Sequence, residues 1–151
     1  MVITAYVDTS AAMKLIVDEA VSASLLVELI APSRGFVVSW LLHTELHCAA
    51  GRHPGVVSLN SIRTVLDAVT LAEITRGDLL AAGTHAPLRS RDALHLATAL
   101  RIGVDEVVTY DGELADAAAA AGIRLLAPPA NASDIPDGHG RALRLHAGGA
   151  I

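Results

Sequence analysis

The chain has 151 residues, of which 52% are hydrophobic and only 3% aromatic, and its formal net charge is −5. These values exclude a disordered chain and predict one domain with a core of Ala, Val, Leu and Ile. The negative charge counts against a large basic surface for nucleic acid. No apolar run reaches the ~20 residues of a membrane span, and we expect a cytoplasmic protein without a secretory signal.

Strand-like and helix-like segments alternate along the chain. Runs rich in β-branched residues predict strands, and apolar residues at helical spacing that end at Gly or Pro predict helices. The predicted strands are residues 2–7, 36–39, 69–74, 104–109 and 123–127. The predicted helices are residues 10–17, 22–30, 41–50, 56–67, 78–82, 92–101 and 114–121.

This alternation predicts an α/β fold of three layers (α/β/α), with a central and mostly parallel sheet. We expect the domain to occupy residues 1–129, because the pattern is lost after Pro129. Residues 130–151, rich in Gly, Ala and Asp, are expected to form a tail that is mobile or docks on a partner.

Four acidic residues lie within or beside apolar segments. Asp8 and Asp111 each directly follow a predicted strand, Glu45 lies within SWLLHTELHCAA, and Asp92 opens RDALHLATAL. A carboxylate is costly to bury unless a cation meets it. Because ligands bind at the carboxyl ends of strands in such sheets, a shared divalent metal ion would explain all four positions.

Each of these acids also has an ordinary structural interpretation. The interpretations are a helix cap for Asp8, a solvated helix face for Glu45, a helix cap with an arginine partner for Asp92, and a turn for Asp111. The remaining acids of the domain are expected at the surface, among them Asp18, Glu19, Asp67, Glu73, Asp78, Asp105 and Glu106.

Polar residues inside apolar helices are expected to be structural. His95 and Thr98 follow Asp92 at helical spacing and are expected to be satisfied interior groups. Cys48 is the only cysteine, which excludes an intrachain disulfide and a thiolate zinc cage and fits a reducing cytosol. We expect it to be a buried small residue. His43 and His47 have a spacing seen in zinc sites, but no third ligand of a zinc pattern follows.

Four motifs in this order carry a resemblance to a known family: YVDTSA, TEL, RDALHLATAL and VVTYDGELADAAAAAGI. Together they resemble the PIN-domain ribonucleases, and most closely the VapC toxins of bacterial type II toxin–antitoxin systems. The resemblance covers residues 2–128. It implies that the metal-binding and catalytic acids are Asp8, Glu45, Asp92 and Asp111, with Asp116 as an additional metal ligand. It also makes Thr9 and Thr109 neighbours that could orient a carboxylate or a bound water.

The same resemblance implies an activity and its partners. The expected activity is hydrolysis of phosphodiester bonds in transfer or ribosomal RNA with Mg²⁺ or Mn²⁺. The expected partners are a cognate antitoxin, whose tail covers the acidic crevice, and a second copy of the chain.

Three other classes of protein are alternatives to a VapC-type ribonuclease. A catalytically inactive PIN-like module that binds proteins is the most serious, although the complete set of acids argues against it. A haloacid-dehalogenase-type phosphatase needs an acid where Ser10 stands, and a nucleotide-binding Rossmann domain needs a glycine-rich first turn.

The cations of the chain are nearly all arginine. Four cationic residues lie in segments that lead to or from the four acids, namely Lys14, Arg52, Arg89 and Arg91. We expect some of these four to contact RNA phosphates, with local salt bridges as the alternative for Arg89 and Arg91.

Overall fold

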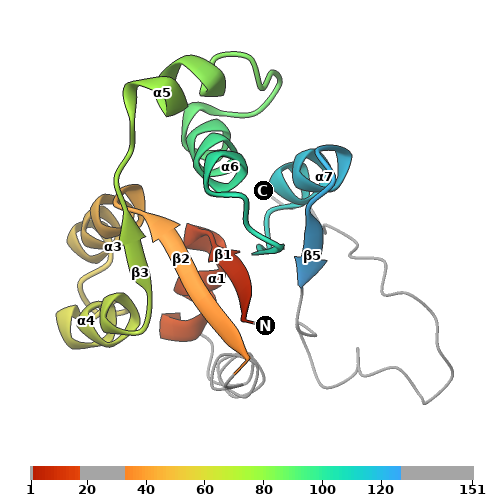
Figure 1. Cartoon of the computed structure of the whole chain (residues 1–151). Helices are drawn as coiled ribbons and strands as arrows, with labels where there is room; N and C mark the ends of the chain where they lie inside the picture. Colours follow the sequence, from red (N-terminus) through yellow and green to blue (C-terminus); the bar gives the residue numbers. More distant parts are fainter. Residues whose placement is uncertain (1, 18–32, 127–151) are drawn as a thin grey trace, which may run out of the picture.

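The computed structural model describes residues 2–17 and 33–126 (Figure 1). Its sheet has five strands in the order β3-β2-β1-β4-β5, and every pairing is parallel. The strands are β1 (Ile3–Val7), β2 (Arg34–Ser39), β3 (Thr70–Ala72), β4 (Glu106–Val108) and β5 (Arg124–Leu126). The helix predicted over residues 22–30, the tail of residues 130–151, Asp18 and Glu19 lie outside the described residues.

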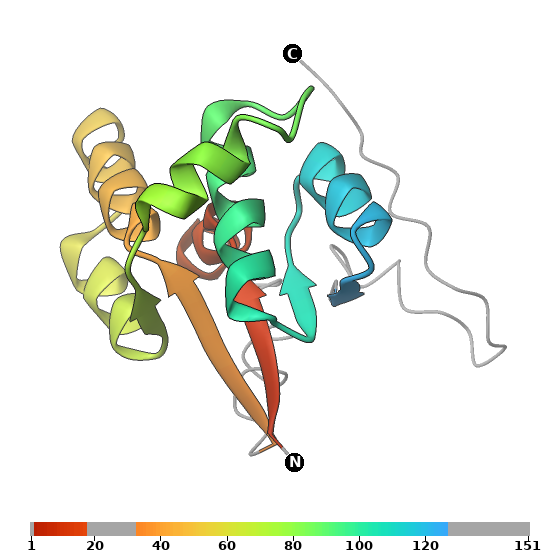
Figure 2. The ribbon, with the colours of Figure 1, turned by 45° about the horizontal axis from the view of Figure 1, so that its top comes forward.

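Six helices flank this sheet in the described part of the chain, so the predicted three-layer α/β fold is confirmed. They are α1 (Thr9–Val17), α3 (Leu41–Arg52), α4 (Leu59–Asp67), α5 (Arg76–Ala82), α6 (Ser90–Ile102) and α7 (Gly112–Ala120). Helices α1, α3 and α4 pack on one another, as α6 does on α5 and α7. Figure 2 shows α6 in front of the strands and α1 behind them. No described helix is long and apolar enough to cross a membrane.

Strand β1 lies at the centre of the sheet and is buried on both faces. Tyr6 packs in the larger of two apolar clusters, while Ala5 and Val7 pack in the smaller one. This division follows from the geometry of a strand, whose successive side chains point to opposite faces. An apolar run without alternation is therefore expected for β1, as for other central strands of parallel sheets.

Glu106 is buried, which corrects the prediction that it lies at the surface. Its Oε2 accepts a hydrogen bond from Arg34 Nε at 3.0 Å, and its Oε1 accepts one from Arg124 Nη2 at 2.7 Å. Because Arg34 belongs to β2 and Arg124 to β5, the Glu106 carboxylate ties three strands together. Two guanidinium groups offset the cost of burying its charge.

Asp78 is also buried, against the prediction of a surface position. It forms a capping box with Thr75 at the start of α5, and its Oδ1 accepts a hydrogen bond from Arg101 Nε at 2.7 Å. Burial alone would raise the pKa of Asp78, but Arg101 and Thr75 hold this pKa below its usual range. The interaction joins α5 to the end of α6.

Replacing Asp78 with Ala should therefore destabilise the fold. We expect a loss of about 1–2 kcal/mol at neutral pH, because the helix cap and the partner of Arg101 disappear together. Since the pKa of Asp78 is depressed in the fold, its contribution is present above the usual carboxyl range and is lost as the pH falls through the folded pKa. Urea unfolding at neutral and acidic pH measures both effects. An equal loss in Asp67→Ala, which removes an exposed acid at the end of α4, would contradict this account.

Cys48 is exposed on α3, so the prediction of a buried cysteine is wrong. The buried face of α3 consists of Leu42, Leu46, Ala49 and Ala50. Cys48 lies outside this helical stripe and faces solvent.

Candidate active site

Asp8 lies between the end of β1 and the start of α1 and is only 2% exposed. Its Oδ1 accepts hydrogen bonds from Ser10 Oγ at 2.7 Å and from the Ala11 backbone N–H at 3.0 Å. Its Oδ2 accepts one from Thr109 Oγ1 at 2.6 Å. Burial raises the pKa of Asp8 despite these hydrogen bonds. Asp8 therefore caps α1, as its structural interpretation proposed, and also holds a desolvated charge at the edge of the sheet.

Asp111 is held beside the end of β4, the neighbour of β1 in the sheet. It is the N-cap of α7, and its Oδ1 accepts a hydrogen bond from the Leu114 N–H at 3.0 Å. Its own N–H donates to Thr109 Oγ1 at 3.0 Å, and the same hydroxyl donates to Asp8. Thr109 thus connects the two acids and orients the Asp8 carboxylate, a role that the family resemblance implied for it.

Glu45 reaches the same region from α3 and is largely buried, with its side chain 10% exposed. Its Oε1 lies 2.8 Å from His95 Nε2, and its Oε2 lies 3.4 Å from an Arg91 guanidinium nitrogen. Burial alone would raise the pKa of Glu45, but hydrogen bonds from His95 and Thr9, together with Arg91, hold this pKa below its usual range. A solvated helix face, the structural alternative for Glu45, does not describe this position.

Asp92 faces the other acids from the first turn of α6. Helix α6 begins at Ser90 with Arg89 as N-cap, so Asp92 is not the cap residue. Burial raises the pKa of Asp92, and the charges of Asp111 and Asp8 raise it further. No described residue donates a hydrogen bond to its carboxylate. His95 and Arg91 lower the pKa of Asp92 only in part, so its net shift is upward.

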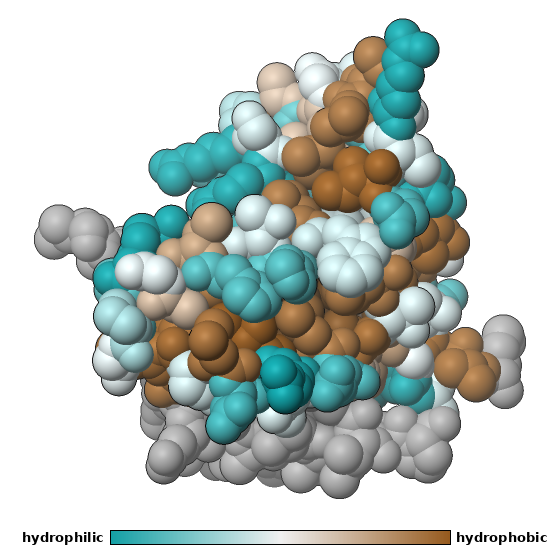
Figure 3. Space-filling view, turned by 90° about the vertical axis from the view of Figure 1, so that its left-hand side faces the viewer, coloured by the Kyte–Doolittle hydropathy of each residue, from teal (hydrophilic) through white to brown (hydrophobic). Residues whose placement is uncertain are grey.

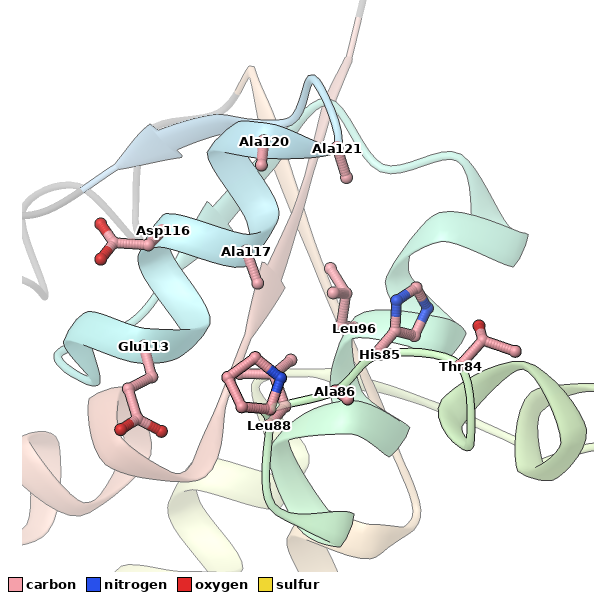
Figure 4. A pocket seen from close by; sticks show the side chains of 11 residues that line it. Thr84, His85, Ala86, Leu88, Leu96, Glu113, Asp116, Ala117, Ala120 and Ala121 are labelled. Atoms are coloured by element: carbon pink, nitrogen blue, oxygen red, sulfur yellow. The ribbon is translucent and has the colours of Figure 1, made fainter.

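Asp116 stands apart from these four acids. It lies on the exposed side of α7, at a hollow between α6 and α7 that is also lined by Glu113, His85 and Leu96. Figure 4 shows the Asp116 carboxylate pointing away from the other labelled side chains. No hydrogen bond or ion pair connects it to Asp8, Asp92 or another member of the group within the described ranges.

The donor chemistry of the four acids fits a hard divalent cation, because all the donors are carboxylate oxygens. Asp92 and the second oxygen of Asp111 receive no hydrogen bond from the described residues, so these oxygens are the most available. Across residues 2–17 and 33–126, no three His, Cys, Asp or Glu side chains lie together in an arrangement that could hold a metal ion as the side chains stand. The ring centroids of His43 and His47 lie 4.2 Å apart, and the described residues supply no third ligand to them.

Two polar residues of this region were not assigned a role from the sequence. Ser10 donates to Asp8 and accepts from the Tyr110 N–H at 2.8 Å, which links the ends of β1 and β4. The Tyr6 hydroxyl lies 2.7 Å from His95 Nδ1. The position of Ser10, two residues after Asp8, could have indicated its contact with Asp8. Nothing in the local sequence indicates the contact between Tyr6 and His95. His95 is a satisfied interior group as predicted, but Thr98 Oγ1 is buried without a hydrogen-bond partner among the described residues.

Comparison with known proteins agrees with the motifs. Residues 5–120 match the PIN domain family. The chain is 35% identical over 127 residues to Ribonuclease VapC46 of Mycobacterium tuberculosis, covering 82% of this chain and 96% of that protein. These two matches show that the chain belongs to the PIN-domain family, in its VapC branch.

Solved structures share the fold at low sequence identity. VapBC2 from Rickettsia felis, bound to a DNA fragment from its promoter, aligns with a TM-score of 0.62 at 13% identity, over 84% of this chain and all of that chain. VapBC-1 from nontypeable Haemophilus influenzae aligns with a TM-score of 0.63 at 15% identity, over 83% and 98% of the two chains. VapC20 from Mycobacterium tuberculosis, a toxin that cleaves the sarcin–ricin loop, aligns with a TM-score of 0.59 at 17% identity, over 75% and 94%.

Proposed function

We propose that the chain is a metal-dependent endoribonuclease that acts as the toxin of a toxin–antitoxin system. The observation that supports the proposal is electrostatic: the charges of Asp111 and Asp8, which follow the neighbouring strands β4 and β1, both raise the pKa of Asp92. A bound cation would relieve the repulsion between these like charges. In a member of a ribonuclease family, phosphodiester hydrolysis is the reaction that such a site supports best.

The acids would contribute to metal binding in different ways. Mg²⁺ or Mn²⁺, when bound, would supply an activated water and neutralise charge on the phosphate. Asp92 and Asp111 would offer the oxygens that are free of hydrogen bonds. Asp8 is held rigidly by Ser10, Ala11 and Thr109, so it would present a fixed carboxylate.

Glu45 would complete the set of four ligands from α3. Its carboxylate is oriented mainly by His95, at 2.8 Å from Oε1. Asp116 would add a fifth carboxylate only if its side chain turned from the exposed side of α7 towards the others. We therefore assign the metal to Asp8, Glu45, Asp92 and Asp111 first.

The proposed substrate is an accessible loop of a transfer or ribosomal RNA. Unpaired loops expose backbone and bases that an A-form helix hides, and VapC20 is described as a toxin that cleaves such a loop. Mapping of RNA 5′ ends in cells after induction of the chain tests this proposal. We expect a few new ends in one RNA class, absent with an Asp8→Asn chain. Identical 5′ ends with both chains would favour a protein-binding module without activity.

The proposed partners are a cognate antitoxin and a second copy of the chain. The structural relatives include VapBC toxin–antitoxin complexes. Large apolar side chains are exposed at Leu59 of α4 and at Leu79 and Leu80 of α5, which gives partners apolar surface to cover. Figure 3 shows hydrophobic residues among hydrophilic ones on the face that it presents.

RNA phosphates should compete with Glu45 for Arg91. The Arg91–Glu45 ion pair is long at 3.4 Å, and the Arg91 side chain is 58% exposed, so the pair is weak. In a cleavage-deficient Asp8→Asn chain, we expect Arg91→Ala to weaken RNA binding and to reduce the slope of log affinity against log salt by about one. Arg63→Ala, which removes an exposed cation from α4, serves as the control. Equal slopes in all three proteins would give Arg91 a purely structural role.

A further inference from the structure

The only tryptophan of the chain stands exposed at the carboxyl edge of the sheet. Trp40 is 44% exposed and joins the end of β2 to the start of α3 (Figure 1). Its backbone N–H donates to the carbonyl oxygen of Ala72, at the end of β3, at 3.0 Å, and its carbonyl oxygen accepts from the His43 N–H at 3.1 Å. The indole ring is therefore attached to a backbone that two strands and a helix hold in place.

Two histidine rings follow the indole along α3. Trp40, His43 and His47 are spaced by three and four residues, which places them on one side of the helix. The ring centroids of Trp40 and His43 lie 5.7 Å apart, and those of His43 and His47 lie 4.2 Å apart. His47 Nδ1 also lies 2.8 Å from the His43 carbonyl oxygen, which orients the last ring. These three residues form an aromatic row that supports the indole.

The aromatic row lies near the candidate active site but is separate from it. Because Tyr6 pairs with Val37, the end of β2 is level with Asp8 after the neighbouring strand, about 5 Å away, and Trp40 follows directly. On α3, Glu45 is two positions from both histidines of the row, and residues two apart on a helix do not face each other. The row and Glu45 are therefore separated by the width of α3, about 10 Å. An RNA strand with one phosphate at the acids would meet the row with a nearby nucleotide.

The charge of the chain leaves a need for RNA contacts other than phosphate contacts. Phosphate contacts by Lys and Arg usually supply much of the affinity for nucleic acid, but this chain has 11 such residues against 16 acids. Two of its arginines, Arg34 and Arg101, are also paired with buried acids. Stacking of a base on an aromatic ring does not depend on net charge, and every base has a flat face to offer. An exposed indole at the ligand-binding edge of the sheet supplies such a contact.

We propose that Trp40 is the stacking site for one unpaired nucleobase of the RNA substrate. The inference rests on the proposed function, because it requires RNA at the neighbouring acids. The base would lie on the exposed part of the indole, and the two histidines of the aromatic row would hold the indole in position. The neighbours of the indole in the row are imidazole rings, which favours a base, with its polar rim, over an aliphatic side chain of a partner protein.

Two oligonucleotides with equal phosphate charge separate stacking from phosphate contacts. One is a dodecamer of adenylate, and the other is an abasic dodecamer with the same sugar–phosphate backbone. The full-length, cleavage-deficient Asp8→Asn chain in Mg²⁺ serves as the parent chain. We expect Trp40→Leu to weaken its binding of the adenylate dodecamer by about 5–100-fold, which corresponds to the loss of one stacked base. Binding of the abasic dodecamer should not change.

Further variants and the fluorescence of the indole serve as controls. Trp40→Phe keeps a smaller ring and should retain part of the affinity that Trp40→Leu loses. Leu80→Ala removes an exposed apolar side chain from α5 and should bind both oligonucleotides as the parent chain does. Because the chain has one tryptophan, tryptophan fluorescence reports Trp40 alone. It should be quenched by the adenylate dodecamer and not by the abasic one.

The outcomes of these measurements are distinguishable. Equal affinity of the parent chain and Trp40→Leu for the adenylate dodecamer would overturn the inference and leave the proposed function standing. If Trp40→Leu changes the oligomeric state in sedimentation without changing that affinity, the indole belongs to a protein interface instead. If Trp40→Leu does not fold in urea unfolding, the fluorescence of the parent chain decides, since equal quenching by both oligonucleotides would exclude a stacked base. A parent chain that binds neither oligonucleotide would contradict RNA binding, and with it both proposals.

Discussion

An Asp8→Asn chain is expected to keep its fold and to lose RNA cleavage by about 10²–10³-fold or more, as when a charged group at a reacting centre is removed. Asn has nearly the shape of Asp and is also a good helix cap, so its oxygen can still accept from the Ala11 N–H. Its amide can donate to Thr109 Oγ1, which is able to accept. What disappears is the negative charge, and with it a ligand for the metal.

The same substitution should raise the thermal stability of the metal-free protein. Burial raises the pKa of Asp8, which means that its charged form is disfavoured in the fold at neutral pH. A neutral side chain removes this cost and also relieves Asp92, whose pKa is raised in part by Asp8. Thermal unfolding with and without Mn²⁺ measures the effect, and we expect the gain to shrink or reverse when the ion is present.

Asp67→Asn is the matched control for both measurements. It makes the same chemical change at an exposed position on α4 and should alter neither cleavage nor melting temperature. Wild-type cleavage by the Asp8→Asn chain would show that Asp8 is not a metal ligand. A normal rate in Asp67→Asn with a lost rate in Asp8→Asn would place the effect at the sheet edge.

Removal of divalent metal is expected to abolish cleavage completely. The acids at the sheet edge provide only oxygen donors, and the single cysteine, Cys48, is exposed on α3 rather than joined to them. Such a donor set favours Mg²⁺ or Mn²⁺ over Zn²⁺. Protein stripped with a chelator should be inactive, should recover with Mg²⁺ or Mn²⁺, and should need no Zn²⁺.

Thermal unfolding can measure Mn²⁺ binding independently of RNA cleavage. Mn²⁺ should raise the melting temperature of the wild-type protein in proportion to the logarithm of its concentration once the site is saturated. The shift should be smaller in Asp92→Asn, because Asp92 offers oxygens free of hydrogen bonds. Full RNA cleavage in excess chelator would refute the metal requirement, and an unchanged shift in Asp92→Asn would remove Asp92 from the ligand set.

The strand pattern of the sequence was sufficient to predict the fold and the place of two acids. Asp8 and Asp111 follow β1 and β4, and parallel neighbouring strands bring their carboxyl ends to one edge. The exposure of Cys48 could have been predicted, because the apolar residues of its helix define a buried stripe that does not include it. The prediction failed because an apolar segment was treated as buried on all sides.

Other features depend on contacts that local sequence does not contain. The partners of Glu106 lie 72 and 18 residues away, and Arg101 lies 23 residues from Asp78. A local pattern therefore treats these buried acids as ordinary surface acids. The Tyr6–His95 contact spans 89 residues and joins a strand to a helix. Such pairs are set by the packing of the whole domain.

The position of β1 between β2 and β4 has a consequence for a chain that is still being synthesised. Ribosomes make β1 first, but its neighbour β4 begins only at Glu106, and Thr109, which holds Asp8, follows later still. Until that point one edge of β1 has no strand to pair with, and closing so long a loop is slow. Products of translation that is interrupted before residue 109 therefore lack both Thr109 and Asp111 and should be harmless to the cell. Toxicity would begin only when almost the entire domain has left the ribosome.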